Sequence, residues 1–297
     1  MRINVKFASD RKSETLMYKP KYFIASEGSG TEVKYFTSLN NSVISKNVTI
    51  INILRDYAKL TNSHPTFIMK MIKEFLLNAK ENKISALELK NKISNFLHDN
   101  YLLVEQERVF KVIENTYKND SELIPKEKIE ALLIALFKEE IYKEVIQNFS
   151  IYFKTQDVTY SELTDKINIE IDRDKQNFKE YQYDEIVEYC KANSVDLFVS
   201  NPTFEFWLLL HFKEIENEDR QKMFENKYVT HSKRYLEKRL NQICNYNKSN
   251  LIFSFFEPFI NDAIKREKDF AEDINELKNN LGSNVGVLIN SIINEKY

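Results

Sequence analysis

Cysteine, glycine and proline are scarce in this chain. Of its 297 residues, only two are cysteine, four are glycine and five are proline. The two cysteines, Cys190 and Cys244, lie far apart and match neither a metal-binding spacing nor a thiol-enzyme motif with a neighbouring histidine. They fit a reducing, cytoplasmic compartment. So little glycine and proline predicts a mostly helical protein with few elaborate turns.

The chain also lacks a charge excess and a long apolar segment. Its 43 Lys and Arg residues nearly balance 45 Asp and Glu residues, for a net charge of −2. Proteins that grip a long duplex by neutralising phosphates are more basic, so any nucleic-acid surface here must be a local patch. Without a run of about 18 apolar residues we expect no membrane span, and the amino terminus has no signal-peptide pattern.

Hydrophobic residues make up 42% of the chain, enough for a sizeable core in one large or two small domains. Short apolar or β-branched runs predict the strands of an α/β sheet at residues 21–26, 48–54, 167–171 and 195–199. Ser29 and Glu32 form a capping-box pattern, which predicts a helix from about Gly30 to Leu39. Asn201 as N-cap and Pro202 at the first helical position predict another helix start.

Between the second and third strands, the pattern changes to helical periodicity. Apolar residues recur at helical spacing from about residue 64 to residue 148. We therefore expect a large all-helical insertion in a parallel sheet flanked by helices, followed by a helical carboxyl-terminal region. The corresponding boundaries are 1–60 for the first part of the sheet domain, 61–160 for the insertion, 161–230 for the second part of the sheet domain and 231–297 for the carboxyl-terminal region.

Acidic residues follow two of the predicted strands. Glu27 comes directly after the first strand, and Asp172 and Asp174 end the third. Ligands of open α/β sheets gather at the carboxyl ends of the strands, so these three carboxylates are expected at one edge. Carboxylates crowded in this way repel one another unless a cation neutralises them, and their hard oxygen atoms favour Mg²⁺ or Mn²⁺.

Two further glutamates have a structural and a functional interpretation. Glu32 completes the capping box, but it also lies one helical turn beyond Glu27 and could be a metal ligand. Glu205 lies in the first turn of a helix, where a carboxylate favours the helix dipole. Its apolar neighbours Phe204, Phe206 and Trp207 indicate partial burial, which suits a catalytic carboxylate.

The remaining polar features favour structural roles. The segment Gly28-Ser29-Gly30-Thr31 could hold a phosphate at a helix start, but it lacks the Gly-Lys-Ser/Thr of a P-loop, and a tight turn is the simpler interpretation. His211, on an apolar helix face, is more typical of a core histidine than of a catalyst.

Several motifs together resemble the RloB-like family. The family's first motif is similar to Phe23-Ile24-Ala25-Ser26-Glu27-Gly28 followed by Thr31-Glu32-x-x-Tyr35-Phe36 of this chain. The acidic residues that end a strand in the family are similar to Asp172-Arg173-Asp174. The most specific similarity is Asn201-Pro202-Thr203-Phe204-Glu205-Phe206-Trp207-Leu208-Leu209-Leu210-His211-Phe212. The tail Asn284-Val285-Gly286-x-Leu288-Ile289 is similar to the family's closing helix. The resemblance covers about 21–56 and 166–297 and leaves out the helical stretch of roughly 60–160.

The resemblance implies a TOPRIM fold and a metal-dependent nuclease of bacterial antiphage defence by abortive infection. It assigns Glu27 as the catalytic or metal-binding glutamate and Asp172 and Asp174 as Mg²⁺ ligands. Glu32 matches the second glutamate of related nucleases with one extra loop residue between. The expected partners are DNA or RNA as substrate and an ATPase encoded nearby. Two alternatives stay open: a non-catalytic scaffold that binds the ATPase through the helical insertion, and a primase-like nucleotidyl transferase.

Overall fold

The structure is a computed structural model. It describes residues 19–26, 30–53, 68–69, 72–73, 75–76, 83–99, 106–117, 119–129, 131–132, 160–175 and 178–295. Among these described residues, no helix is both long and apolar enough to cross a membrane.

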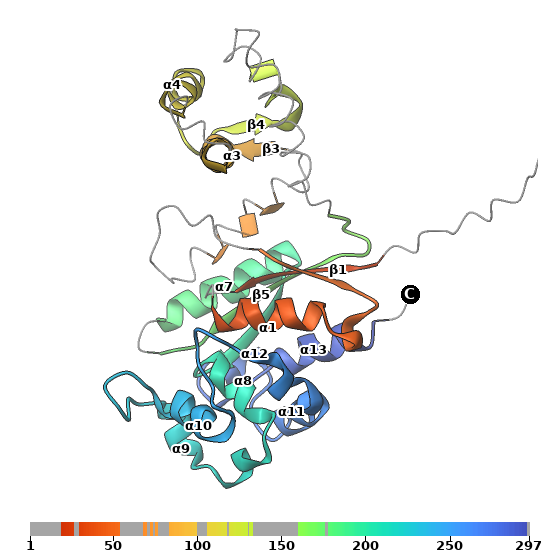
Figure 1. Cartoon of the computed structure of the whole chain (residues 1–297), viewed down its shortest axis with the longest axis vertical. Helices are drawn as coiled ribbons and strands as arrows, with labels where there is room; N and C mark the ends of the chain where they lie inside the picture. The colour runs from red at the N-terminus through yellow and green to blue at the C-terminus, as the bar shows by residue number, and fades with distance from the viewer. Residues whose placement is uncertain are drawn as a thin grey trace, which may run out of the picture.

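The centre of the molecule is a five-stranded sheet in the order β2-β1-β5-β6-β7. Its strands are β1 (Lys21–Ser26), β2 (Thr49–Asn52), β5 (Lys166–Asp172), β6 (Asp196–Asn201) and β7 (Gly282–Ser283). The first four run parallel, and β7 is antiparallel to β6. The strands predicted at 21–26, 167–171 and 195–199 are confirmed to within two residues, and the strand predicted at 48–54 is shorter. The fold is therefore the expected α/β sheet, mostly parallel and flanked by helices (Figure 1).

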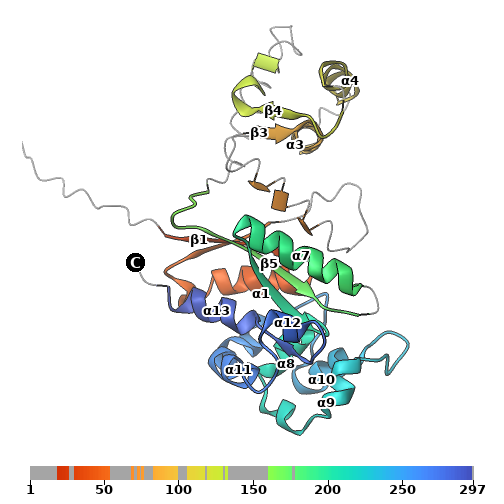
Figure 2. The same ribbon diagram turned by 180° about the vertical axis from the view of Figure 1, so that it is seen from behind.

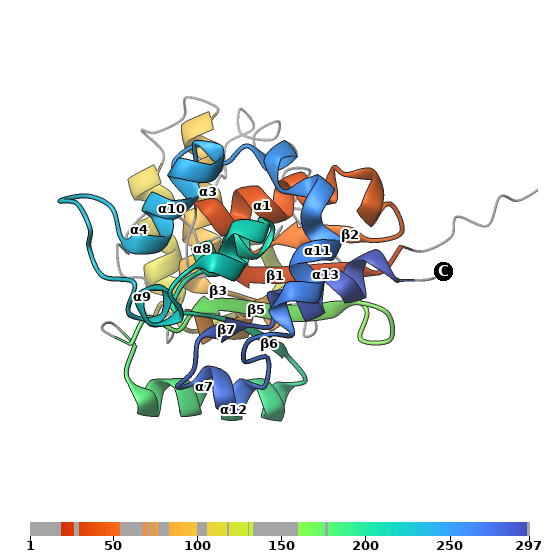
Figure 3. The ribbon, with the colours of Figure 1, turned by 90° about the horizontal axis from the view of Figure 1, so that it is seen from below.

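Helices cover both faces of this sheet, as seen from below in Figure 3. One face carries α1 (Thr31–Asn40), α8 (Phe204–Leu210), α10 (Tyr235–Cys244), α11 (Ile260–Glu267) and α13 (Val285–Ile293), with α9 (Arg220–Glu225) beside them. The other face carries α7 (Glu180–Asn193) and α12 (Ile274–Leu277). Short 3₁₀ turns lie at Val43–Ser45, Lys126–Lys128, Lys213–Asn217, Phe253–Phe255 and Glu257–Phe259.

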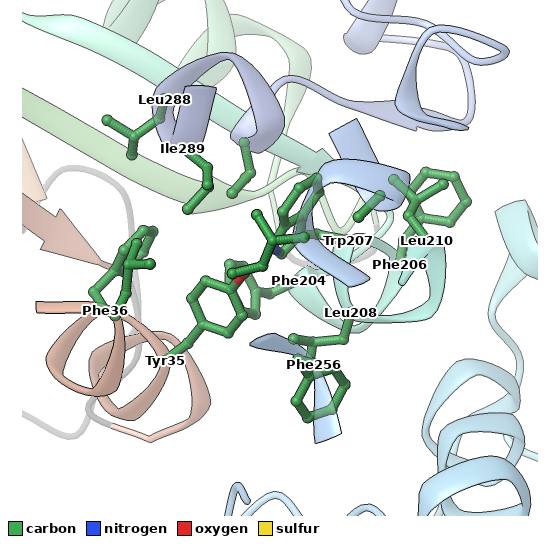
Figure 4. Packing of buried hydrophobic residues seen from close by; sticks show 14 of the residues in the cluster. Tyr35, Phe36, Phe204, Phe206, Trp207, Leu208, Leu210, Phe256, Leu288 and Ile289 are labelled. Carbon is green, nitrogen blue, oxygen red and sulfur yellow. The ribbon is translucent and has the colours of Figure 1, made fainter. Parts of the chain in front are cut away.

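The larger of the two described cores that flank the sheet lies between the sheet and α8. All seven residues of α8 are buried, because the helix is covered by α1, α10, α11 and α13. Figure 4 shows Trp207 and Phe204 between side chains of α1 and α13. A helix that is apolar all round must be buried on all sides, which explains why the motif containing Trp207 is so hydrophobic.

The stretch predicted as an all-helical insertion is not helical throughout. It contains α3 (Ala86–Asp99) and α4 (Gln106–Thr116), within the region of predicted helical periodicity, but also the antiparallel strands β3 (Lys83–Ser85) and β4 (Leu123–Pro125). The buried pair Ile84 and Ile124 holds these strands together. Strands of three residues are too short to give a recognisable alternation of polar and apolar residues. In Figures 1 and 2 this unit lies on the opposite side of the sheet from α9, α10 and α11.

Part of this stretch packs on the sheet itself. Ile68 and Ile72 belong to helical residues and are fully buried in the core beneath α7. The ring of Phe75 lies 4.7 Å from that of Phe23 in β1. These residues therefore contribute to the stability of the sheet.

The two predicted helix starts differ from those observed. The N-cap of α1 is Gly30, which makes no side-chain cap hydrogen bond, so Glu32 occupies the second helical position rather than the third that a capping box needs. Asn201 does not cap α8, because it remains in β6 and pairs with Gly282 of β7. The peptide bond from Asn201 to Pro202 is cis, and α8 begins only at Phe204.

A buried carboxyl group holds the start of α13 against the end of α11. Glu267 is fully buried, and its Oε1 accepts a hydrogen bond of 2.9 Å from the backbone N–H of Gly286. Its Oε2 has no hydrogen-bond partner among the described residues. A methyl group on Gly286 would lie within 2.9 Å of the Glu267 Cδ and 3.0 Å of the Trp207 ring. The absence of a side chain at Gly286 therefore makes room for Glu267.

The second glycine of this region, Gly282, lies against the backbone of Ala271. The two residues form a bridge, and a methyl group on Gly282 would lie 2.7 Å from the Ala271 nitrogen and closer still to its carbonyl oxygen. This close approach of two backbones requires glycine at position 282.

Candidate functional site

The carboxyl ends of β1, β5 and β6 meet at one edge of the sheet. The register places Ser26 opposite Glu170 and Asp172 opposite Ser200. Glu27, which directly follows β1, lies outside the described residues together with Gly28 and Ser29. Its approach to Asp172 and Asp174 stays a prediction.

Asp172 caps a neighbouring helix. Its Oδ1 accepts a 2.7 Å hydrogen bond from the backbone N–H of Phe204, the first residue of α8. The sequence pattern assigned this role to Asn201, but it is taken over by a residue that lies 32 positions before Phe204. Asp172 is therefore fixed at the amino end of α8, where the helix dipole favours its negative charge.

Asp174 has a different partner. Its Oδ2 lies 3.0 Å from Nη1 of Arg234, and both side chains are 19% exposed. Between the two aspartates, Arg173 is buried and donates to the carbonyl oxygens of Phe178 and Lys278, beside α7 and α12. The Asp-x-Asp segment thus presents two acids with separate contacts and one inward-facing arginine.

Glu32 and Glu205 are two buried carboxylates that interact with each other. Glu32 is 6% exposed and Glu205 is 3% exposed. The Oε1 of Glu205 accepts a 3.0 Å hydrogen bond from the Tyr246 hydroxyl, whose oxygen lies 3.0 Å from Oγ1 of Thr31. Burial raises the pKa of Glu32, and the negative charge of Glu205 raises it further. Both glutamates therefore belong to one polar cluster between α1 and α8.

Lys248 supplies the positive charge of this cluster. Its Nζ lies 3.4 Å from Oε1 of Glu205 and 3.9 Å from Oε1 of Glu237. The charge of Glu205 is the largest cause of a raised pKa at Lys248, and Asp172, Glu32 and Glu237 add to it. Three predicted site residues thus interact with the ammonium group of Lys248, whose side chain is 57% exposed. We refer to Glu32, Asp172, Glu205 and Lys248 as the acidic cluster.

Sequence reasoning missed Lys248 and also Glu170. Lys248 lies in a polar segment after α10 that has no motif, so only the tertiary structure brings it to Glu205. Glu170 is buried inside β5, two residues before Asp172 and therefore on the same side of the sheet. The signal that could have revealed it is a charged residue inside an apolar strand, since such residues are rarely buried without a reason.

Within the described part of the chain, no three His, Cys, Asp or Glu residues gather closely enough to hold a metal ion. The predicted metal site also requires Glu27, which lies outside the described residues. The chemistry of the donor set suits the expected ion, because Glu32, Asp172 and Glu205 offer only carboxylate oxygens, the ligands of Mg²⁺ and Mn²⁺.

His211, Cys190 and Cys244 have structural roles. His211 is buried, its Nε2 lies 3.2 Å from the Tyr35 hydroxyl, and burial lowers its pKa to about 3. The ring is therefore neutral, as expected for a core histidine. Burial raises the pKa of Cys190 to about 12 and that of Cys244 to about 11, so neither is a thiolate nucleophile near neutral pH.

The family model described as "RloB-like protein" matches residues 22–292 of the sequence. The chain belongs to the RloB-like family. The match begins in β1, ends in α13, and brackets the stretch of 60–160 that the motif resemblance left out. No curated protein and no solved structure matches the chain. Membership therefore rests on the family model, in agreement with the motifs in β1, β5 and α8.

Proposed function

We propose that this member of the RloB-like family is a metal-dependent nuclease with a TOPRIM-type site, acting in bacterial antiphage defence by abortive infection. The observation that carries the proposal is the acidic cluster, in which Glu32, Asp172 and Glu205 all interact with Lys248 beside the carboxyl ends of parallel strands. Burying like charges together costs free energy, and the capping of α8 accounts for only one of these three carboxylates, Asp172.

In this proposal Glu27, Asp172 and Asp174 hold Mg²⁺ or Mn²⁺, and Glu32 adds a further carboxylate. The chemistry that a bound ion supplies is activation of water and neutralisation of phosphate charge. Glu205, oriented by the Tyr246 hydroxyl, is the candidate to accept a proton. The half-exposed ammonium of Lys248 can donate a hydrogen bond to a phosphate oxygen while it remains close to Glu205.

The direct test is an incubation of the protein with labelled DNA and RNA in Mg²⁺, in Mn²⁺ and in chelator. We expect cleavage that needs the metal and is lost in Glu27→Gln and Asp174→Asn. Asp262→Asn is the matched control, because Asp262 lies in α11 with its side chain 49% exposed and pairs only loosely with Lys265 at 3.8 Å. Full cleavage by Asp174→Asn would refute the assignment.

A second candidate is a non-catalytic subunit that binds an ATPase partner through the stretch of 61–160. One observation favours it: Asp172, Asp174 and Glu205 each already have a protein partner. A site that has lost turnover keeps such contacts and needs no ion. Under this alternative the wild-type protein cleaves none of the substrates, and removal of residues 83–129, which leaves Ile68, Ile72 and Phe75 in the core, abolishes capture of the ATPase.

A further inference from the structure

A pocket of about 270 Å³ opens at the carboxyl ends of β5 and β6, next to the pair of Asp174 and Arg234. Asp174 and Lys175 border it from the end of β5, and Pro202 borders it from the end of β6. The far wall comes from α9 and the segment after it, including Phe224 and Lys227, and from Arg234. Its volume approaches the lower end of the range for small-molecule sites, roughly 300 Å³.

The pocket carries more positive than negative charge. Lys175, Lys227 and Arg234 line it, against the carboxylates of Asp174 and Glu225. The Nζ of Lys227 lies only 2.7 Å from Oε2 of Glu225, but the Lys227 side chain is 72% exposed. Because water screens such an exposed pair, it contributes little and exchanges readily for another anion. The pocket is therefore able to accept an anionic group from solvent.

An aromatic ring lies among these cations. The ammonium of Lys175 lies over the half-buried Phe224 ring, 5.2 Å from its centroid, so a base that stacks on this face of the ring takes the place of the ammonium. Arg234 is held from two sides, by Asp174 at 3.0 Å and by the Tyr228 ring at 5.2 Å. Proteins bind single-stranded nucleic acid by an aromatic ring, on which a base stacks, beside cations such as Arg234 and Lys227, which pair with phosphates.

We infer that this pocket is a nucleotide subsite for a single strand of nucleic acid. One base stacks on Phe224, and the adjoining phosphates pair with Lys227 and Arg234. Because Asp174 forms part of the wall, the strand passes directly from this pocket to the proposed metal site. The inference rests on the proposed function for the identity of its ligand, and it adds the position at which the substrate is held beside the reacting phosphate.

The test measures binding separately from cleavage. Fluorescently labelled single-stranded DNA and RNA oligonucleotides are titrated with the full-length protein in chelator, and the dissociation constant is followed by fluorescence anisotropy. We expect Phe224→Leu to weaken binding about 10-fold, as for the loss of one stacked base. We expect Lys227→Met to weaken it several-fold and to reduce the slope of log affinity against log salt by about one.

Lys222→Met is the matched control. Lys222 lies in α9, carries an exposed ammonium 3.7 Å from Asp219, and does not line the pocket. It should change the affinity less than 2-fold. Lys227 is exposed, so its substitution leaves folding intact even if Phe224→Leu should destabilise α9. The inference is overturned if the wild-type protein binds neither oligonucleotide, or if Phe224→Leu and Lys227→Met bind as tightly as Lys222→Met.

Failure of the proposed function gives a different result. If the wild-type protein binds a strand through this pocket but cleaves none with Mg²⁺ or Mn²⁺, the subsite stands and the nuclease proposal fails. The DNA and RNA arms of the titration identify the sugar, since a subsite that contacts only base and phosphate binds both, whereas a contact to the 2′-hydroxyl favours RNA.

Discussion

Replacement of the buried Glu267 by glutamine should make the protein more stable at alkaline pH and less stable at acidic pH. Burial is the main cause that raises the pKa of Glu267 from its ordinary 4.5 to about 8. The folded protein therefore keeps this proton up to about pH 8, whereas the unfolded chain releases it near pH 4.5. Between these values the unfolded state binds fewer protons, so the free energy of unfolding falls as pH rises.

The size of this effect follows from the shift in pKa. Each pH unit between the two values removes about 1.4 kcal/mol, so the full penalty approaches about 5 kcal/mol at pH 8 and about 3 kcal/mol at pH 7. Glutamine cannot ionise, and its Oε1 can still accept the N–H of Gly286. The amide of glutamine carries two N–H donors, whereas the protonated acid carries one O–H donor. Because Oε2 of Glu267 has no partner among the described residues, the additional donor stays unsatisfied, and this costs about 1 to 2 kcal/mol at every pH.

Urea unfolding at pH 5, 6, 7 and 8 measures this difference directly. Glu267→Gln should be less stable than the wild type by about 1 kcal/mol at pH 5 and more stable by about 3 kcal/mol at pH 8, with the curves crossing between. The exposed Glu276 in α12 provides the control, since Glu276→Gln should follow the wild-type curve. Because the other acids contribute equally to each protein, a Glu267→Gln curve parallel to the wild type would refute the reasoning.

Three further predictions concern the acidic cluster and the glycine contact. Lys248→Met should lower the free energy of unfolding by about 1 to 2 kcal/mol at pH 7, because it leaves buried carboxylates without their cation. The loss should shrink near pH 4, where the carboxylates bind protons. Urea unfolding measures it, with Lys238→Met at an exposed position as the control. Gly282→Ala should cost at least about 3 kcal/mol in thermal melts, because a methyl group there meets backbone atoms, whereas Gly30→Ala, with nothing within 4 Å, should cost under about 1 kcal/mol. Asp172→Ala should destabilise by about 1 kcal/mol through loss of its cap, while Asp172→Asn retains an acceptor and remains stable; equal melting of both variants would argue against the capping role.

Elements defined by a local pattern were predictable from the sequence. The apolar run of β1 gave its bounds to the residue and that of β5 to within one residue, since burial on both faces of a strand leaves a direct trace in the sequence. The start of α8 was not predictable. Its cap comes from Asp172 in another strand, and Asn201 is retained in the sheet by pairing with Gly282.

In the candidate site too, residues within a local pattern were predictable, whereas residues brought in by tertiary contacts were not. Glu32, Asp172 and Glu205 were found because each follows or opens a recognisable element, and the structure brings all three to Lys248. Lys248 itself was out of reach, because it lies 43 positions beyond Glu205 in a segment without periodicity. The Arg234 partner of Asp174 was missed for the same reason: only tertiary contacts bring the two side chains together.

The buried Arg173 has a consequence for the aspartates on either side of it. Its guanidinium lies between the rings of Phe178 and Tyr183, 5.4 Å and 5.2 Å from their centroids. A shift of the strand end by one residue would exchange the two faces and force an aspartate into this ring-lined space, away from Phe204 and Arg234. Arg173 thus fixes the register of the strand end. With Arg173 buried, Asp172 faces the backbone N–H of Phe204 and Asp174 faces Arg234, so both carboxylates are oriented by the protein itself.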